Sequence, residues 1–354
     1  MISNKKILVT GGTGSLGKVL VRRMLSESEG TPAKVIVLSR DEAKQHFMRV
    51  EYQQRKNVTD DIIYKDFEQI LEFRIGDVRD YHTICNALRN VDIVINAAAL
   101  KQVPTCEYFP YEAVMTNITG GENIVRAIRE HRFPVETVVA VSTDKACKPV
   151  NVMGMTKSIQ ERIIICGNLC CSTTRFICVR YGNVLASRGS VIPLFHEQIK
   201  NGGPVTITTP EMTRFLLSLE TAVDTIFAAI QNASPGETYV PKTPAARIIE
   251  IVTALIADRN IEIRETGIRP GEKIHETLVS EEEAWRTYDR GDYYVIQPIL
   301  PELRMRKEKV NYKYLNREYS SADSICSFKE VKKLLERHNL LVGQEIVIEG
   351  EFLR

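Results

Sequence analysis

The stretch Lys6-Ile7-Leu8-Val9-Thr10-Gly11-Gly12-Thr13-Gly14-Ser15-Leu16-Gly17 decides the fold. It opens with a short apolar run that predicts a buried strand, and residues 18–25 after it have the pattern of a helix. The glycines at 11, 14 and 17 would permit a tight turn, a close backbone approach to a pyrophosphate, and close packing of helix on strand. Free N–H groups at the helix start favour phosphate. We expect cofactor contacts from Gly11, Thr13, Gly14, Ser15, Leu16 and Gly17.

Further strand patterns alternate with helical segments downstream. Apolar runs occur at residues 34–38, 91–99, 135–142 and 176–180, and one more strand is expected before Asp77. Strands and helices that alternate at this spacing predict the α/β class, with a Rossmann-type doubly wound, largely parallel sheet. Ligands of such sheets bind at the carboxyl ends of the strands, where each motif of this chain falls.

The segment after the second strand indicates the cofactor. A lone carboxylate there would hold the ribose 2′-hydroxyl of NAD, whereas this chain has Ser39, Arg40 and Lys44. Two cations at a helix start suit a 2′-phosphate, so we predict NADP, with NAD as the alternative. The other expected contacts are Asp77 and Val78, which would flank the adenine, and Ala97 and Ala98, whose small side chains leave room for a cofactor.

Composition and charge argue against several classes of partner. The 354 residues are 44% hydrophobic and 26% charged, as in ordinary soluble globular proteins. With 47 Lys and Arg against 45 Asp and Glu, the net charge is +2, which gives no basis for nucleic-acid binding. No apolar run reaches the ~18 residues that span a bilayer. The eight cysteines lack the paired spacing of a zinc site, so we expect no metal, and reduced thiols in a cytoplasmic protein.

Residues 142–157 have the layout of a known catalytic segment. Ser142-Thr143-Asp144-Lys145 is followed by Met153-Gly154-Met155-Thr156-Lys157. This layout resembles the active site of short-chain dehydrogenases/reductases, whose Tyr-x-x-x-Lys motif provides a tyrosine that takes a proton while a nicotinamide takes a hydride. Met153 holds the position of that tyrosine, and a thioether cannot carry a proton. Either proton transfer has moved to neighbouring residues or the chain is not an enzyme.

The chain resembles the extended short-chain dehydrogenase/reductase family and, within it, the UDP-N-acetylglucosamine 4,6-dehydratases of the capsule and flagellin-glycan type. The stretches that carry the resemblance are residues 10–17, 39–44, 97–104, 142–145, 151–157, 180–190 and 269–273. Members of this group oxidise C4 of the sugar, remove the C5 proton, eliminate water across C5–C6 and return the hydride to C6. The resemblance implies UDP-N-acetylglucosamine as substrate, a UDP-2-acetamido-2,6-dideoxy-hexos-4-ulose as product, and a homo-oligomer, often a hexamer.

The resemblance also implies roles in catalysis. The implied residues are Asp144 as acid for the C6 hydroxyl, Lys145 as base at C5, Thr143 at the 4-OH, Lys157 at the nicotinamide ribose, and Asn117 in support of the active-site lysine. Some dehydratases of this group also carry methionine at the place of Met153, so the substitution does not argue for an inactive protein. We hypothesise that Asp144, or a water held by Thr143 and Asp144, takes the 4-OH proton.

The second half of the chain would bind the sugar nucleotide. By resemblance, its contacts are Lys101, Asn183, Arg188, Ser190, Val191, Arg214, Arg269 and Glu272. Arginine suits a diphosphate because its planar fork bonds phosphate in a bidentate manner. We expect two interleaved domains: residues 1–183 plus 214–240 as an NADP-binding Rossmann domain, and residues 184–213 plus 241–354 as a smaller α/β UDP-sugar-binding domain with a C-terminal tail.

Two other functions stay open. A UDP-hexose 4-epimerase shares the fold and cofactor, but it normally relies on the tyrosine that is missing here and has no need of an Asp-Lys pair. An inert regulator that binds NADP or a UDP-sugar would not need to retain both Asp144 and Lys145. A dehydratase of this group can retain or invert the configuration at C5, and between these we favour retention.

Overall fold

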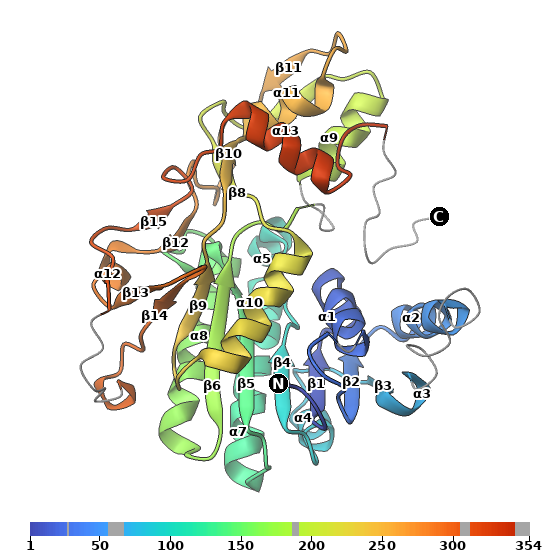
Figure 1. Cartoon of the computed structure of the whole chain (residues 1–354), viewed down its shortest axis with the longest axis vertical. Coiled ribbons are helices and arrows are strands. Elements are labelled where there is room, and N and C mark those ends of the chain that lie inside the picture. The colour runs from blue at the N-terminus through green and yellow to red at the C-terminus, as the bar shows by residue number, and fades with distance from the viewer. Residues whose placement is uncertain (27, 56–66, 186–190, 305–311, 344–354) are drawn as a thin grey trace.

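The computed structural model describes residues 1–26, 28–55, 67–185, 191–304 and 312–343. A nine-stranded sheet in the order β13-β14-β9-β6-β5-β4-β1-β2-β3 runs through its centre (Figure 1). The strands from β9 across to β3 pair in parallel, and β14 and β13 add an antiparallel edge. The strands are β1 (Lys6–Thr10), β2 (Lys34–Ser39), β3 (Leu71–Ile75), β4 (Ile93–Asn96), β5 (Thr137–Thr143), β6 (Arg175–Tyr181), β9 (Thr238–Pro241), β13 (Thr287–Arg290) and β14 (Tyr293–Ile296). This arrangement confirms the predicted α/β class with a doubly wound, largely parallel sheet.

Helices cover both faces of the sheet because its central strands are apolar on both sides. In β1, Ile7 and Val9 belong to the core under α1 and α10, whereas Leu8 between them belongs to the core under α4, α7 and α8. The helices around the sheet are α1 (Ser15–Leu25), α2 (Glu42–Arg55), α3 (Phe67–Ile70), α4 (Tyr81–Ala87), α5 (Val103–Tyr108), α6 (Pro110–Ala113), α7 (Gly120–His131), α8 (Val152–Cys170) and α10 (Leu219–Asn232), with the π-helix η1 (Val114–Thr119) and the 3₁₀ turn η2 (Asp144–Ala146). None of the helices in the described ranges is both long and apolar enough to cross a membrane.

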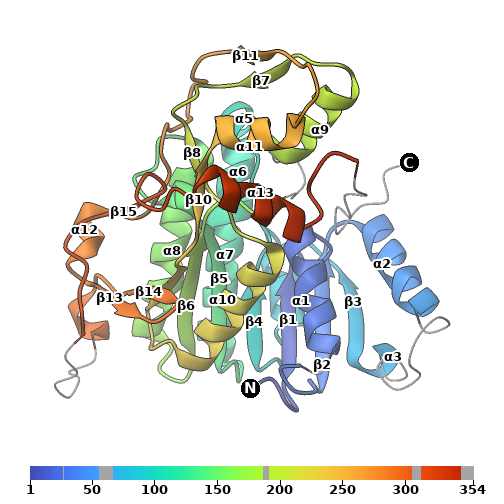
Figure 2. The same cartoon turned by 45° about the horizontal axis from the view of Figure 1, so that its top comes forward.

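A second group of elements lies above the carboxyl ends of the parallel strands (Figures 1 and 2). Its helices α9 (Val191–Lys200), α11 (Ile248–Ile256) and α13 (Phe328–Arg337) share one apolar core. Its strands form the pairs β7 (Val205–Ile207) with β11 (Ile263–Glu265), β8 (Thr213–Phe215) with β10 (Ala245–Arg247), and β12 (Thr277–Val279) with β15 (Tyr319–Ser320). The short helix α12 (Glu281–Ala284) follows β12, whereas the turn η3 (Pro301–Leu303) packs against α8. The division into two interleaved domains stays a prediction, and β13 and β14, from the segment 241–354, extend the large sheet.

The glycine turn after β1 has the form that its sequence requires. Gly11 has a φ of +67°, and a Cβ placed on it would lie 2.8 Å from the Cα of Ala98 at the end of the neighbouring strand. A Cβ on Gly17 would collide with the backbone of Gly12, so α1 can lie this close to the turn only without side chains at these positions. The first turn of α1 therefore starts at the carboxyl edge of the sheet, where its free N–H groups are available to a phosphate.

Candidate active site

A large cavity of about 1170 Å³ lies between the carboxyl ends of the parallel strands and the second group of elements. Ligand sites typically measure about 300–1,000 Å³, so this cavity is larger than a typical site for one small ligand. Of the residues predicted to bind cofactor or substrate or to act in catalysis, those that line the cavity are Gly11, Thr13, Gly14, Ser15, Leu16, Gly17, Ser39, Arg40, Lys44, Asp77, Val78, Ala97, Ala98, Lys101, Thr143, Asp144, Lys145, Met153, Lys157, Asn183, Val191, Arg214, Arg269 and Glu272. Arg188 and Ser190, also predicted to bind the substrate, lie outside the described residues.

The end of the cavity next to α1 offers hydroxyls and cations. Thr13 and Ser39 are hydrogen-bonded through their hydroxyls at 2.8 Å, which ties the glycine turn to the end of β2. Arg40 is more than half exposed, and its Nη1 lies 3.7 Å from Oδ2 of Asp77. The Nζ of Lys44 is 3.1 Å from Oδ2 of its neighbour Asp41, also at the surface. Both cations thus stand at the rim with weak, solvent-screened partners that an anionic group could displace.

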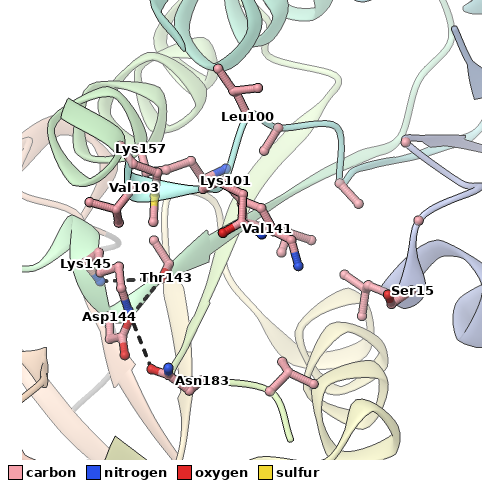
Figure 3. Close-up of a pocket in the computed structure, with 18 of the residues that line it drawn as sticks. Ser15, Leu100, Lys101, Val103, Val141, Thr143, Asp144, Lys145, Lys157 and Asn183 are labelled. Carbon is pink, nitrogen blue, oxygen red and sulfur yellow. Dashed lines mark hydrogen bonds and ion pairs between the residues drawn. The ribbon is translucent and has the colours of Figure 1, made fainter. Parts of the chain in front are cut away.

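The opposite side of the cavity holds a compact acid–base cluster (Figure 3). Asp144, the first residue of η2, is fully buried, and its Oδ1 accepts hydrogen bonds from the Thr143 hydroxyl at 2.8 Å and from Lys145 Nζ at 3.1 Å. Its other oxygen, Oδ2, is buried without a hydrogen-bond partner among the described residues. Lys145 Nζ also contacts Oδ1 of Asn183 at 3.5 Å, at the limit of a hydrogen bond. Asp144 therefore offers one unused acceptor.

Glu276 belongs to this cluster, although the sequence did not single it out. Its Oε1 lies 3.3 Å from Lys145 Nζ and 3.8 Å from Nε of Arg214, and its side chain is almost fully buried. It follows the predicted stretch Arg269–Lys273 by three residues, just before β12, and lines the same cavity. Glu276 is the next carboxylate after Glu272 in the sequence, which is the one signal that could have pointed to it. No periodic pattern of apolar residues around Glu276 predicts that its side chain faces inward.

The surroundings of Lys145 favour its charged form. Burial alone would lower the pKa of its ammonium, but the carboxylates of Asp144 and Glu276 outweigh burial and the repulsion from Arg214, and they raise the pKa above its ordinary value. The amine therefore carries a proton at neutral pH while the cavity contains only the groups of the chain.

Lys157 has the opposite electrostatic setting. Its Nζ donates to the backbone carbonyl of Val141 at 2.6 Å and to Oε1 of Gln160, and burial lowers its pKa from 10.5 to about 8, with partial compensation by Glu161. Asn117, expected to support this lysine, bonds the hydroxyl of the preceding residue, Thr156, at 3.0 Å, and thereby connects η1 with α8. Asn117 thus supports the turn of α8 that carries Lys157 and does not contact the lysine through this hydrogen bond.

Met153 is a packing residue in this structure. It is 5% exposed and packs against Cys106 and Ala113, with its side chain at the cavity wall. Among the described residues that line the cavity, the one tyrosine is Tyr181, which sits in the core under α10 with a pKa raised by burial. In the described part of the cavity wall, therefore, no tyrosine stands at the motif position, and the buried Tyr181 does not replace it.

The side of the cavity that faces the second group of elements is basic. Arg214 extends from β8, and its Nη1 donates to the carbonyl of Thr213 at 2.7 Å and to that of Ile274 at 3.2 Å, which fixes the guanidinium at the wall. Arg269 is exposed and lines the cavity. Glu272 accepts a hydrogen bond from Thr208 at 3.3 Å. This side can therefore hold an anionic group beside a polar, hydroxyl-rich one.

No group of three or more His, Cys, Asp or Glu side chains in the described part of the chain is arranged to hold a metal ion. The chemistry that these residues can perform is proton transfer by Asp144 and Lys145 and binding of anions by the glycine turn and the arginines.

Comparisons with known proteins show the family to which the chain belongs. A family described as "Polysaccharide biosynthesis protein" matches residues 7–298. A protein of Rickettsia akari (strain Hartford) named UDP-glucose 4-epimerase is 42% identical over 344 residues, which cover 95% of this chain and 96% of that protein. A protein of the same name from Rickettsia canadensis (strain McKiel) is 44% identical over 301 residues, 84% of each chain.

Solved structures show the same fold. The structure titled "X-ray structure of Pen from Bacillus thuringiensis" matches with a TM-score of 0.84 and 32% identity over 96% of this chain and all of that one. DesIV, a dTDP-glucose 4,6-dehydratase from Streptomyces venezuelae solved with NAD and TYD, matches with a TM-score of 0.65 and 19% identity over 94% of this chain and 98% of that one, a likeness of fold alone. The chain therefore belongs to the polysaccharide biosynthesis protein family and has the fold of the extended short-chain dehydrogenases/reductases.

Proposed function

We propose that this protein is a UDP-N-acetylglucosamine 4,6-dehydratase that forms a UDP-2-acetamido-2,6-dideoxy-hexos-4-ulose. The observation that carries the proposal is the pair of Asp144 and Lys145 at the cavity wall, where Asp144 Oδ2 is buried and has no hydrogen-bond partner among the described residues. Elimination of water needs an acid for the leaving hydroxyl and a base for the C5 proton, and this pair can supply both. A simple carbonyl reduction would need one proton donor only.

The cavity fits a nicotinamide dinucleotide. The turn at Gly11 and Gly17 excludes any Cβ and would bring a pyrophosphate onto the backbone, and Lys157 stands beyond it near the cluster. When bound, the cofactor would supply an acceptor for the C4 hydride and its return at C6. Ser39, Arg40 and Lys44 support NADP over NAD because two cations and a hydroxyl suit a 2′-phosphate. The structural neighbour DesIV was solved with NAD, which keeps NAD as the alternative.

The chain's own groups can complete the proton transfers. The carboxylate of Asp144 takes the proton of the 4-OH through its Oδ2 as C4 is oxidised. The Thr143 hydroxyl donates a hydrogen bond to Oδ1 and so orients the carboxylate. Neutral Lys145 takes the C5 proton, which the new C4 ketone has made acidic. Asp144 then gives its proton to the 6-OH, which leaves as water. The proton taken from O4 thus departs with O6, Lys145 returns its own proton to C5, and the side chains end as they began.

A UDP-hexose 4-epimerase is the second candidate, and the name of the rickettsial relatives favours it. Epimerisation needs one group to take and return the 4-OH proton, which Asp144 could do. It gives no function to Lys145, whose amine is held in contact with two buried carboxylates. The dehydratase uses both members of the pair, and for this reason we prefer it.

The test is incubation of the purified protein with UDP-N-acetylglucosamine and either NADP or NAD, followed by mass spectrometry and NMR. A product lighter by one water, with a C6 methyl group, supports the dehydratase. UDP-N-acetylgalactosamine of unchanged mass would establish the epimerase instead, and binding without turnover would overturn both. In deuterated water, the configuration at C5 of the product distinguishes the retention that we favour from inversion. Faster turnover with NADP than with NAD is the expected cofactor result.

A further inference from the structure

Glu276 presents a second buried carboxylate to the amine of Lys145. It approaches from the segment before β12, whereas Asp144 approaches from η2, so the ammonium lies between carboxylates of two distant parts of the chain. Glu276 Oε2 is buried and, in the described part of the molecule, has no hydrogen-bond partner. The backbone N–H of Glu276 is held by the Ser321 hydroxyl at 2.9 Å, which fixes the position of the residue. The Oε2 atom is therefore an acceptor that no group of the described structure uses.

The proposed function leaves Lys145 with a proton too many. A base for C5 must be a neutral amine, yet the two carboxylates hold Lys145 in its charged form. Asp144 cannot accept this proton, because as carboxylate it has to receive the proton of the 4-OH. The remaining charged group of opposite sign that contacts Lys145 in the described structure is Glu276 at 3.3 Å.

We propose that Glu276 is the positioning residue that takes the surplus proton of Lys145 when substrate binds, so that a neutral amine faces C5. The inference rests on the proposed function, and it assigns to Glu276 the control of one proton. In this step one N–H bond of the Lys145 ammonium breaks and one O–H bond forms on Glu276. No net charge moves into or out of the site, and the proton returns to the lysine after the product leaves.

The physical cause is the removal of water from the cavity. A salt bridge deprived of water loses much of its advantage over a hydrogen-bonded pair of neutral amine and carboxylic acid. Engagement of Asp144 by the sugar hydroxyls removes part of the support for the ammonium, and Arg214 already opposes it. In the part of the chain that the structure describes, the charged groups that act on Lys145 are Asp144 from η2, Glu276 from the segment before β12, and Arg214 from β8.

The test is the pH dependence of dehydration by Glu276→Gln and Glu276→Asp. In the wild type the transfer is internal, so the rate of product formation should be nearly flat from pH 7 to 9. The glutamine variant keeps the size of the side chain but cannot take the proton, so Lys145 must lose it to solvent. We expect its rate to fall about 100-fold at pH 7 and to rise about tenfold per pH unit above that. The aspartate variant should be slower than the wild type with a flat profile.

Two further readings separate this inference from a structural role and from the proposed function. Formation of reduced cofactor on mixing, followed at its near-ultraviolet absorbance, reports oxidation at C4 and should stay within about twofold of wild type in Glu276→Gln, since that step uses Asp144. If the rate of product formation by Glu276→Gln did not change with pH, the inference would be overturned, whatever the absolute rate of the variant. A wild-type rate that rises tenfold per pH unit would also overturn it, a result that needs no variant to fold. Absence of the dehydrated product from the wild type would overturn the proposed function itself.

Discussion

The protein has two buried clusters, each made of acidic and basic side chains. They differ in how completely their polar atoms are hydrogen-bonded. The cavity cluster consists of Asp144, Lys145, Glu276 and Arg214, and the core cluster consists of Glu161, Arg180, Glu283 and Arg286. In the core cluster the guanidinium of Arg180 bonds both oxygens of Glu161, at 3.0 and 2.6 Å, and both oxygens of Glu283, at 2.7 and 3.0 Å. In the cavity cluster each carboxylate has one buried oxygen without a partner among the described residues.

The difference teaches what each cluster is for. A buried carboxylate oxygen without a partner costs about 1–3 kcal/mol, so a folded chain retains one where a ligand completes the pairing. The core cluster needs no such completion: it joins α8, β6 and α12 and does not line the cavity. Despite burial, which acts to raise the pKa of Glu283, the charge of Arg180 lowers it to about 2. Glu283 is therefore ionised at neutral pH and the core cluster, with its oxygens fully bonded by Arg180, holds the fold, whereas the cavity cluster has acceptors left for a ligand or a proton.

The largest effect is expected from Asp144→Asn. The amide keeps the size of the side chain but cannot take the 4-OH proton or give it to O6, so kcat should fall about 1,000-fold, within the usual range for a lost general acid–base. The free energy of unfolding should change little, since Lys145 keeps Glu276 as a partner. Product formation and urea denaturation measure the two quantities. Turnover near that of the wild type would show that another group transfers this proton.

The core cluster should respond to Arg180→Met with a loss of stability and not of chemistry. The substitution leaves Glu161 and Glu283 buried without their shared cation, and the free energy of unfolding should fall by about 3–5 kcal/mol. Urea denaturation checks this loss, with Arg264→Met as the matched control. Arg264 pairs with Glu262 at 3.3 Å on the surface, where removal should cost less than about 1 kcal/mol. Equal losses in the two variants would contradict the distinction between the clusters.

The fold could be predicted from local sequence. The turn at residues 11–17 and the alternation of apolar runs with helical segments sufficed, because buried parallel strands and their glycine turn are specified by residues adjacent in the chain. The pair of Asp144 and Lys145 could also be placed at the cavity from the sequence, because the two residues are neighbours at the end of β5.

The long-range charge pairs could not be predicted in the same way. Glu276 reaches Lys145 from a segment more than a hundred residues away, and Arg180 joins Glu161 to Glu283 across a similar separation. Such partners depend on how α12 and β12 pack against the sheet, and the local pattern of a carboxylate in a loop does not reveal this. Neither did it show that Met153 would pack against Cys106, since a methionine on a helix fits core and cavity equally.

The smallest effect that we expect is a pH dependence of stability caused by Lys157. This buried lysine differs from both clusters because it forms no ion pair with a carboxylate among the described residues. Its pKa in the folded protein is about 8, below its ordinary 10.5, because burial opposes the ammonium. Below about pH 8 the folded and unfolded chains both carry this proton, and the cost of burying the charge is felt in full. Between about pH 8 and 10.5 the unfolded chain binds more protons, so stability should rise with pH.

The measurement is urea denaturation of the cofactor-free wild type and Lys157→Met at pH 7, 8 and 9.5. The difference in free energy of unfolding between the two proteins isolates Lys157, because all other titrating groups are shared. It should be constant from pH 7 to 8 and then shift in favour of the wild type, by at most about 1.4 kcal/mol per pH unit. A difference that stayed constant up to pH 9.5 would mean that the hydrogen bonds to Gln160 and to the Val141 carbonyl stabilise the buried ammonium as fully as carboxylates stabilise Arg180. Lys157 would then resemble the core cluster, although it has no ion-pair partner among the described residues.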